Sequence, residues 1–126
     1  FIKSGHLKLL HEMNIEVHVR SVLCQGLLAN TNFNLHKKLG FLEKKLFEIR
    51  SFTKDKNISL LNLSLNFVLN LKEVSKIVIG IQSLQQLKQI IDITKYSNKS
   101  LDLDIINNFA LEEKNFNKVY ELMSTL

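Results

Sequence analysis

Apolar and polar residues alternate over residues 15–22, a pattern that predicts a β-strand. Most of its apolar members are β-branched, and the set is Ile15, Val17, Val19 and Val22, with a one-residue slip at Ser21. A turn that bends at Gly26 follows the strand. Before the strand, apolar residues at near-helical spacing predict a short helix, which Ser4 can cap and Asn14 ends.

Apolar residues at intervals of three and four predict an amphipathic helix over residues 34–53, after a loop at residues 30–32. Its stripe consists of Leu35, Leu39, Leu42, Leu46 and Ile49. After a break at residues 55–57, Ser59 is placed to cap a second helix over residues 60–71. That helix is apolar almost all round, apart from a row of Asn62, Asn66 and Asn70. It should be buried on most sides, yet the chain offers little to bury it against.

A second strand is predicted at residues 76–80, where a short apolar run ends in glycine. Continuous apolar strands are typical of parallel sheets that are buried on both faces. Ser83 then caps a helix that runs to about residue 94 and has an inner face of Leu84, Leu87, Ile90 and Ile91. Residues 101–126 contain two candidate helices. One is built on Leu103, Ile106, Ala110 and Leu111, the other on Phe116, Val119, Tyr120 and Met123.

Strands that alternate with helices predict a parallel α/β architecture. Only two strands are predicted, and two parallel strands can neither bury both faces nor pair both edges. We therefore expect the 126 residues to be a section of one larger α/β sheet or barrel.

Composition narrows the function classes. The chain is 45% hydrophobic and carries a formal charge of +5, so it belongs with folded rather than disordered proteins. Among its 17 cations only Arg20 and Arg50 can form the guanidinium forks common in nucleic-acid recognition. We expect solvated lysine-bearing helix faces and no nucleic-acid binding. A single cysteine, Cys24, and no run of 18 uncharged apolar residues favour a cytoplasmic protein without membrane contact.

The turn Gly80-Ile81-Gln82-Ser83 is the best local candidate for a binding site. It ends a strand and opens a helix, whose first N–H groups and Ser83 hydroxyl can bind a phosphate. The alternative is an ordinary strand-to-helix turn with a serine cap. The segment from Arg20 to Gly26 leaves the other strand at the same end, so the two loops together could hold a dinucleotide.

Other reactive side chains do not form a recognisable catalytic set. The four histidines, His6, His11, His18 and His36, lack the spacing of metal ligands, so no metal site is expected. Nothing in the sequence activates Cys24, which we interpret as a spectator thiol. Paired carboxylates and a glycine-rich phosphate loop are also missing from the sequence.

Three segments resemble, in order and spacing, the last part of the aldo/keto reductases. Residues 15–28, with Val-Arg-Ser and Gln-Gly-Leu-Leu motifs similar to the bacterial branch, resemble the seventh strand and its loop. Residues 63–69 resemble the following helix, and residues 75–87 resemble the eighth strand and its phosphate-binding turn. The resemblance covers about residues 1–95 and leaves residues 96–126 as an unmatched C-terminal tail. It implies a partial (β/α)8 TIM barrel, with strands 7 and 8 and their helices, at the C-terminal end of one barrel domain.

The resemblance also implies a cofactor and its contacts. The family reduces aldehydes and ketones with NADP(H), here with NAD(H) as the alternative, and uses no metal. By position, the pyrophosphate on the strand-7 side would be lined by Ser21, Leu23 and Gly26, and Arg20 replaces the aromatic residue that stacks on the nicotinamide. The turn that holds the adenosine phosphate is matched by Gly80, Gln82, Ser83 and Gln86. Departures from the family pattern are Val22 for Pro, Gln89 for Glu and Ile90 for Asn.

The family's catalytic Asp, Tyr, Lys and His lie on earlier strands, and no residue of this chain matches them. The resemblance therefore implies a cofactor-binding section of a carbonyl reductase that needs the N-terminal part of the barrel and is inactive by itself. The alternative is a small non-enzymatic helical module whose lysine-rich faces bind an acidic partner.

Overall fold

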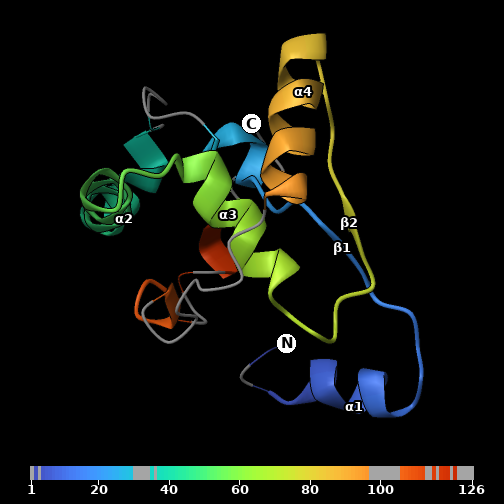
Figure 1. Cartoon of the computed structure of the whole chain (residues 1–126). Helices are drawn as coiled ribbons and strands as arrows, with labels where there is room; N and C mark the ends of the chain where they lie inside the picture. The colour runs from blue at the N-terminus through green and yellow to red at the C-terminus, as the bar shows by residue number, and fades with distance from the viewer. Residues whose placement is uncertain are drawn as a thin grey trace.

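The computed structural model describes residues 2, 4–29, 35, 37–96, 106–112, 115, 117–119 and 121. It has a mixed α/β architecture, mostly helical, with a small parallel sheet (Figure 1). The strands are β1 (His18–Arg20) and β2 (Lys76–Val78), and the 3-10 helices are η1 (Cys24–Gly26) and η2 (Lys37–Leu42). The α-helices are α1 (His6–Glu12), α2 (Glu43–Asp55), α3 (Leu60–Leu69) and α4 (Leu84–Lys95).

Strands β1 and β2 pair in parallel, with Val19 opposite Ile77. The sequence predicted both strands, at residues 15–22 and 76–80. Each observed strand is shorter than its predicted range. Strand β1 ends where Ser21 adopts a φ of 60°, a left-handed conformation that turns the chain out of the sheet. Immediately before β1 in the sequence, the Val17 carbonyl accepts the main-chain N–H groups of Ser75 (2.9 Å) and Lys76 (3.2 Å). The pairing of the two segments therefore begins just before the strands themselves.

The two faces of the sheet have different surroundings. Val19 and Ile77 are half-buried on the face that carries the helices, since Ile77 lies against α3 and α4. The other face carries His18, Arg20, Lys76 and Val78, all exposed, with Val78 at 56%. Parallel sheets are normally covered on both faces. Only one face of this sheet is covered by the described residues.

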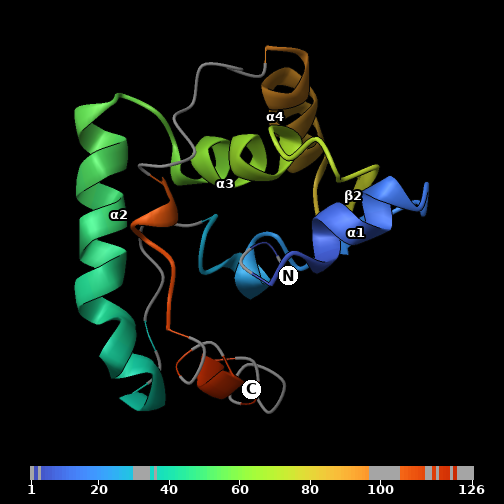
Figure 2. The same cartoon turned by 90° about the horizontal axis from the view of Figure 1, so that it is seen from below.

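Helix α3 lies at the centre, between α2 on one side and α4 with the sheet on the other (Figures 1 and 2). Leu65 and Asn66 are completely buried. The expectation that this helix has little to be buried against is therefore wrong. Its predicted start is confirmed, because Ser59 Oγ accepts the N–H of Asn62 at 3.0 Å.

Hydrogen bonds along α3 explain how its polar row is tolerated in the core. The Asn66 side-chain amide donates to the Asn62 carbonyl (3.1 Å) and to Asn62 Oδ1 (2.8 Å). One turn later the Asn70 amide donates to the Asn66 carbonyl at 2.8 Å. Ser64 Oγ likewise donates to the Leu60 carbonyl at 2.8 Å. The side-chain donors are therefore satisfied within the helix, whereas the buried Oδ1 of Asn66 has no hydrogen-bond partner among the described residues.

The helix predicted over residues 34–53 is divided into η2 and α2. Gly40 lies in the first part, where its low helix propensity weakens a continuous α-helix. The predicted apolar stripe is nevertheless confirmed, because Leu39, Leu42 and Leu46 are buried in one cluster with Leu27 and Val119. Val119 comes from the second candidate helix in the tail. The predicted loop 30–32, and Leu103, Phe116, Tyr120 and Met123 of the tail helices, lie outside the described residues.

Two predictions are wrong, one about the buried face of α4 and one about the N-terminal cap of α1. The predicted inner face of α4 is mostly outside, since Leu84 (67%), Leu87 and Ile91 are exposed and only Ile90 is half-buried. Ser4 does not cap α1: Gly5 holds that position with a φ of 75°, and Ser4 Oγ lies 2.7 Å from Nδ1 of His6. The cap of α4 by Ser83 is confirmed.

A carboxylate connects the two strands on the open face of the sheet. Glu16 Oε1 lies 2.5 Å from Lys76 Nζ and 3.1 Å from His18 Nε2. Hydrogen bonds from Lys76 and then His18 hold the pKa of the Glu16 carboxyl below its ordinary value of 4.5. The pair joins residues far apart in sequence, so it should contribute to strand pairing while Glu16 is ionised.

Replacing Leu65 with alanine should destabilise the chain by about 2–5 kcal/mol, because it opens a cavity in a fully buried position. The free energy of unfolding can be measured by urea denaturation followed by circular dichroism. Leu84→Ala is the matched control: Leu84 is 67% exposed, and its loss should change stability by less than about 0.5 kcal/mol. Equal losses in the two variants would contradict the central position of α3.

The stabilising effect of Glu16 should disappear in acid. Because its pKa is lowered by folding, the contribution is complete above the ordinary value of 4.5 and is lost as pH falls through the lower folded pKa. Urea midpoints of the chain and of Glu16→Gln should therefore differ at pH 7 and converge below pH 4.5. A difference that stays constant down to pH 2.5 would argue against this ion pair.

Candidate functional site

The candidate site lies at the carboxyl ends of β1 and β2. Parallel pairing brings these ends to the same edge of the sheet. The segment after β1 contains η1, and the segment after β2 leads into α4. Loops at this edge form the ligand sites of α/β proteins.

The loop after β1 is built from left-handed residues. Ser21, Cys24, Gln25 and Gly26 have φ values of 60°, 45°, 52° and 93°. Short main-chain bonds close it, from Cys24 N–H to Ser21 O and from Gly26 N–H to Leu23 O, both 3.0 Å. The sequence predicted the bend at Gly26. It contained no signal for the three non-glycine residues, whose strained conformation depends on their packing.

The loop after β2 is held by two reciprocal hydrogen bonds. Ser83 Oγ accepts the N–H of Gln86 at 3.2 Å, and Gln86 Oε1 accepts the N–H of Gln82 at 2.9 Å. This arrangement is a close relative of the capping box, in which the third helical residue reaches back over the helix start. It fixes the N-terminus of α4 beside the end of β2.

A cavity of about 900 Å³ separates the two loops. Seven of the nine predicted site residues line it: Ser21, Leu23, Gly26, Gly80, Gln82, Gln86 and Gln89. The other two do not. Arg20 is exposed on the open face of the sheet, and the Ser83 hydroxyl is used as the helix cap.

Other residues of the cavity were not predicted. Gln25 and Ala29 come from the first loop, and Ile81 from the second. Leu61 comes from α3, whose position over the loops is a consequence of tertiary packing. No local pattern in the sequence could have indicated it.

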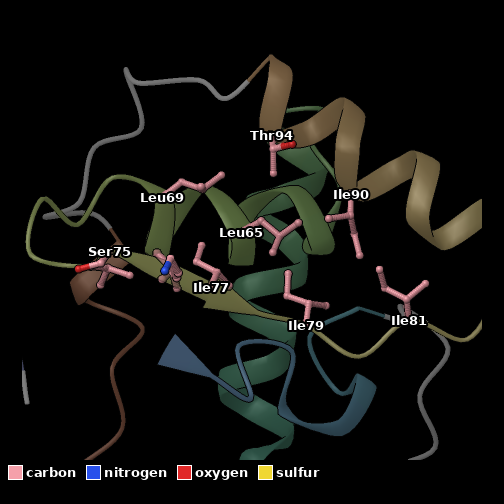
Figure 3. Close-up of a pocket in the computed structure, with 11 residues that line it drawn as sticks. Leu65, Leu69, Ser75, Ile77, Ile79, Ile81, Ile90 and Thr94 are labelled. Atoms are coloured by element: carbon pink, nitrogen blue, oxygen red, sulfur yellow. The ribbon is translucent and has the colours of Figure 1, made fainter. Parts of the chain in front are cut away.

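A second, smaller cavity of about 410 Å³ lies behind the strand (Figure 3). It is lined by Ile77, Ile79 and Ile81 from one side of β2 and its extension, with Leu65 of α3 and Ile90 of α4 facing them. Alternate residues of a strand share a face, so this side of β2 is its helix-facing side. The cavity is an incompletely filled part of the apolar layer between sheet and helices.

The larger cavity is suited to binding. Its volume lies within the range of about 300–1,000 Å³ typical of small-molecule sites. Apolar walls from Leu23, Leu61 and Ile90 are combined with the amides of four glutamines. The N-terminus of α4 adds main-chain donors and a positive dipole end for an anion. None of the described residues that line the cavity has a side chain that ionises near neutral pH, so these residues can hold and orient a ligand.

The interpretation of the cavity rests on the residues described above. No protein-family model matches the chain, and no curated protein matches it. Within the described residues, no helix is long and apolar enough to cross a membrane, and no three His, Cys, Asp or Glu side chains are grouped to hold a metal ion.

Cys24 should react slowly with a thiol reagent in the folded chain. Burial raises the pKa of its thiol, so little thiolate is present at pH 8. The reaction with Ellman's reagent should accelerate on addition of unfolding concentrations of urea, relative to free cysteine in the same solvent. Because the chain has one cysteine, the signal has a single source. A folded-state rate equal to that of free cysteine would contradict the described packing of η1.

Proposed function

We propose that this chain is the C-terminal, cofactor-binding section of an NAD(P)H-dependent aldo/keto reductase with a (β/α)8 barrel. The parent enzyme reduces an aldehyde or ketone to an alcohol, and this section supplies no catalytic residue. One observation carries the proposal: seven residues selected by resemblance to that family line a single cavity at the carboxyl ends of two parallel strands. They come from two segments more than fifty residues apart, which sequence proximity cannot bring together.

The uncovered surfaces support a section of a larger barrel. Val78 is 56% exposed on the open face of the sheet, where a closed barrel would place its interior. Leu84, Leu87 and Ile91 form an exposed stripe along α4. Each strand also has only one neighbour among the described residues. Further strands and helices of the parent would cover all three surfaces.

The roles of the lining residues follow from their chemistry. The dinucleotide, when bound, supplies the hydride. The N-terminus of α4 would hold its pyrophosphate through main-chain N–H groups. Leu23 and Leu61 would exclude water. The Gln89 amide and Nε2 of Gln86 would hydrogen-bond to ribose hydroxyls, because Oε1 of Gln86 already accepts the N–H of Gln82.

Two parts of the family's site lie outside this cavity. Arg20 is at the carboxyl end of β1 but exposed on the open face of the sheet, so the geometry gives no support to the stacking role that the resemblance assigns to it. A proton for the carbonyl oxygen must come from a general acid. In this proposal that acid belongs to the N-terminal part of the barrel, so the section requires that part for turnover.

An observation on α2 favours the alternative, a basic interaction module. Phe47 is 71% exposed, and the exposed lysines Lys44 and Lys54 share its side of the helix. Such a surface suits an acidic partner with an apolar anchor. The two functions are separable, because the interaction module needs no affinity for a nucleotide.

Replacing Gly80 with leucine should weaken dinucleotide binding about tenfold or more, by filling the cavity. A side chain at Gly80 meets no atom within 4 Å and needs no unusual φ, so the fold should tolerate it. Binding can be measured by the change in NADH fluorescence on titration with the chain. Gly40→Leu is the matched control, since Gly40 also has open space around it but lies outside the cavity.

Equal affinity in the two variants would remove this cavity as the binding site, and no NADH binding by the unmodified chain would overturn the cofactor assignment. Oxidation of NADPH by the purified chain that depends on an added aldehyde would overturn the claim that it holds no catalytic residue.

A further inference from the structure

Helix α2 has an exposed outer face. Its inner face belongs to the core, where Leu46 and Thr53 are buried. Phe47 lies on the other side of the helix and is 71% exposed, with Ser51 one turn further along the same side. Figures 1 and 2 show α2 at the outside of the molecule, with α3 between it and the sheet. The outer face is therefore separate from both the larger cavity and the open face of the sheet.

Two pairs of opposite charges border Phe47 on this outer face. Residues eleven apart lie on nearly the same side of an α-helix, because eleven residues make about three turns. Glu43 and Lys54 are therefore aligned on one side of Phe47. Lys44 and Asp55 are aligned on its other side, with the order of the charges reversed. All four side chains are exposed, and none of them forms an ion pair with another residue that the structure describes.

This arrangement of charges is complementary to itself. When two copies of a helix pack in antiparallel orientation, each flank meets the same flank of the other copy with its direction reversed. Glu43 then lies beside Lys54 of the second copy, and Lys44 lies beside Asp55 of the second copy. Twofold symmetry repeats each contact, so ion pairs border the interface on both flanks and at both ends. Charges at such flanking positions determine which helices pair and in which orientation.

The middle of the outer face is complementary as well. Phe47 and Ser51 are equally far from Ile49, which is midway between Glu43 and Asp55. Antiparallel packing about this point places the large Phe47 ring of each copy on the small Ser51 of the other. The exposed ring then loses its contact with water, which favours association. A uniformly acidic partner, in contrast, would be repelled by Glu43 and Asp55.

We propose that the outer face of α2 is a self-association surface, through which two copies of this chain form an antiparallel homodimer. The proposal is independent of the cofactor assignment, since it uses no residue of the larger cavity. The helix has 13 residues and is therefore about 20 Å long. One pair of such helices gives an interface at the small end of the specific range, so we expect a dimer in exchange with the monomer.

Sedimentation velocity over about a hundredfold range of concentration should reveal the dimer and give its dissociation constant. Lys44→Glu and Asp55→Lys should each weaken the dimer about tenfold, because each creates two contacts between like charges. The double variant should restore the original affinity, since its charges are complementary again with exchanged signs. Each substitution places the charge that the helix dipole favours at its end of α2, so the helix itself is not weakened. Lys88→Glu on α4 is the matched control and should leave the dissociation constant unchanged.

Three results would overturn the proposal. The first is a chain that stays monomeric over this range; binding of polyglutamate by that monomer would assign the outer face to an acidic partner. The second is a dimer that Lys44→Glu leaves unchanged or that Lys88→Glu weakens equally, because association would then use another surface. The third is a double variant that associates more weakly than either single variant. That result would indicate parallel pairing, in which Glu43 meets Lys44 of the second copy.

Discussion

Parallel pairing of β1 with β2 is the constraint on which the rest of the structure depends. Each strand has three residues, and more than fifty residues separate them. Closing so long a loop costs entropy that a few ladder hydrogen bonds cannot offset. The pairing is therefore supported from outside the sheet, by the Ser75–Val17 bonds, by the ion pair of Glu16 with Lys76, and by helices packed on one face.

Helix α3 lies beside the sheet, where Leu65 faces Ile77 of β2 across the smaller cavity. It is buried against α2 on one side and against α4 and the sheet on the other, so it connects the two halves of the chain. Its asparagine row would be costly in a core, but the donors are satisfied along the helix itself. The same packing places Leu61 over the loops that follow the strands. The core and the candidate site thus share one element.

The uncovered surfaces and the larger cavity have a common origin in this arrangement. Parallel pairing sends both loops to one edge, where they enclose a space lined by amides and apolar groups. It also leaves one face of the sheet and the outer stripe of α4 exposed. In the proposed barrel, these surfaces would meet the remaining strands and helices, and the cavity would hold the cofactor.

Local chemistry in the sequence determined the type and approximate place of most elements, the caps at Ser59 and Ser83, and the buried stripe of Leu39, Leu42 and Leu46. These features depend on side-chain periodicity and on neighbours within four residues, which a sequence displays directly. The resemblance also selected seven residues that line one cavity. The tertiary structure alone decided where the strands stop, how α3 is covered and which side of α4 remains exposed. Those outcomes depend on left-handed residues such as Ser21 and on contacts between distant segments, for which a local pattern carries no signal.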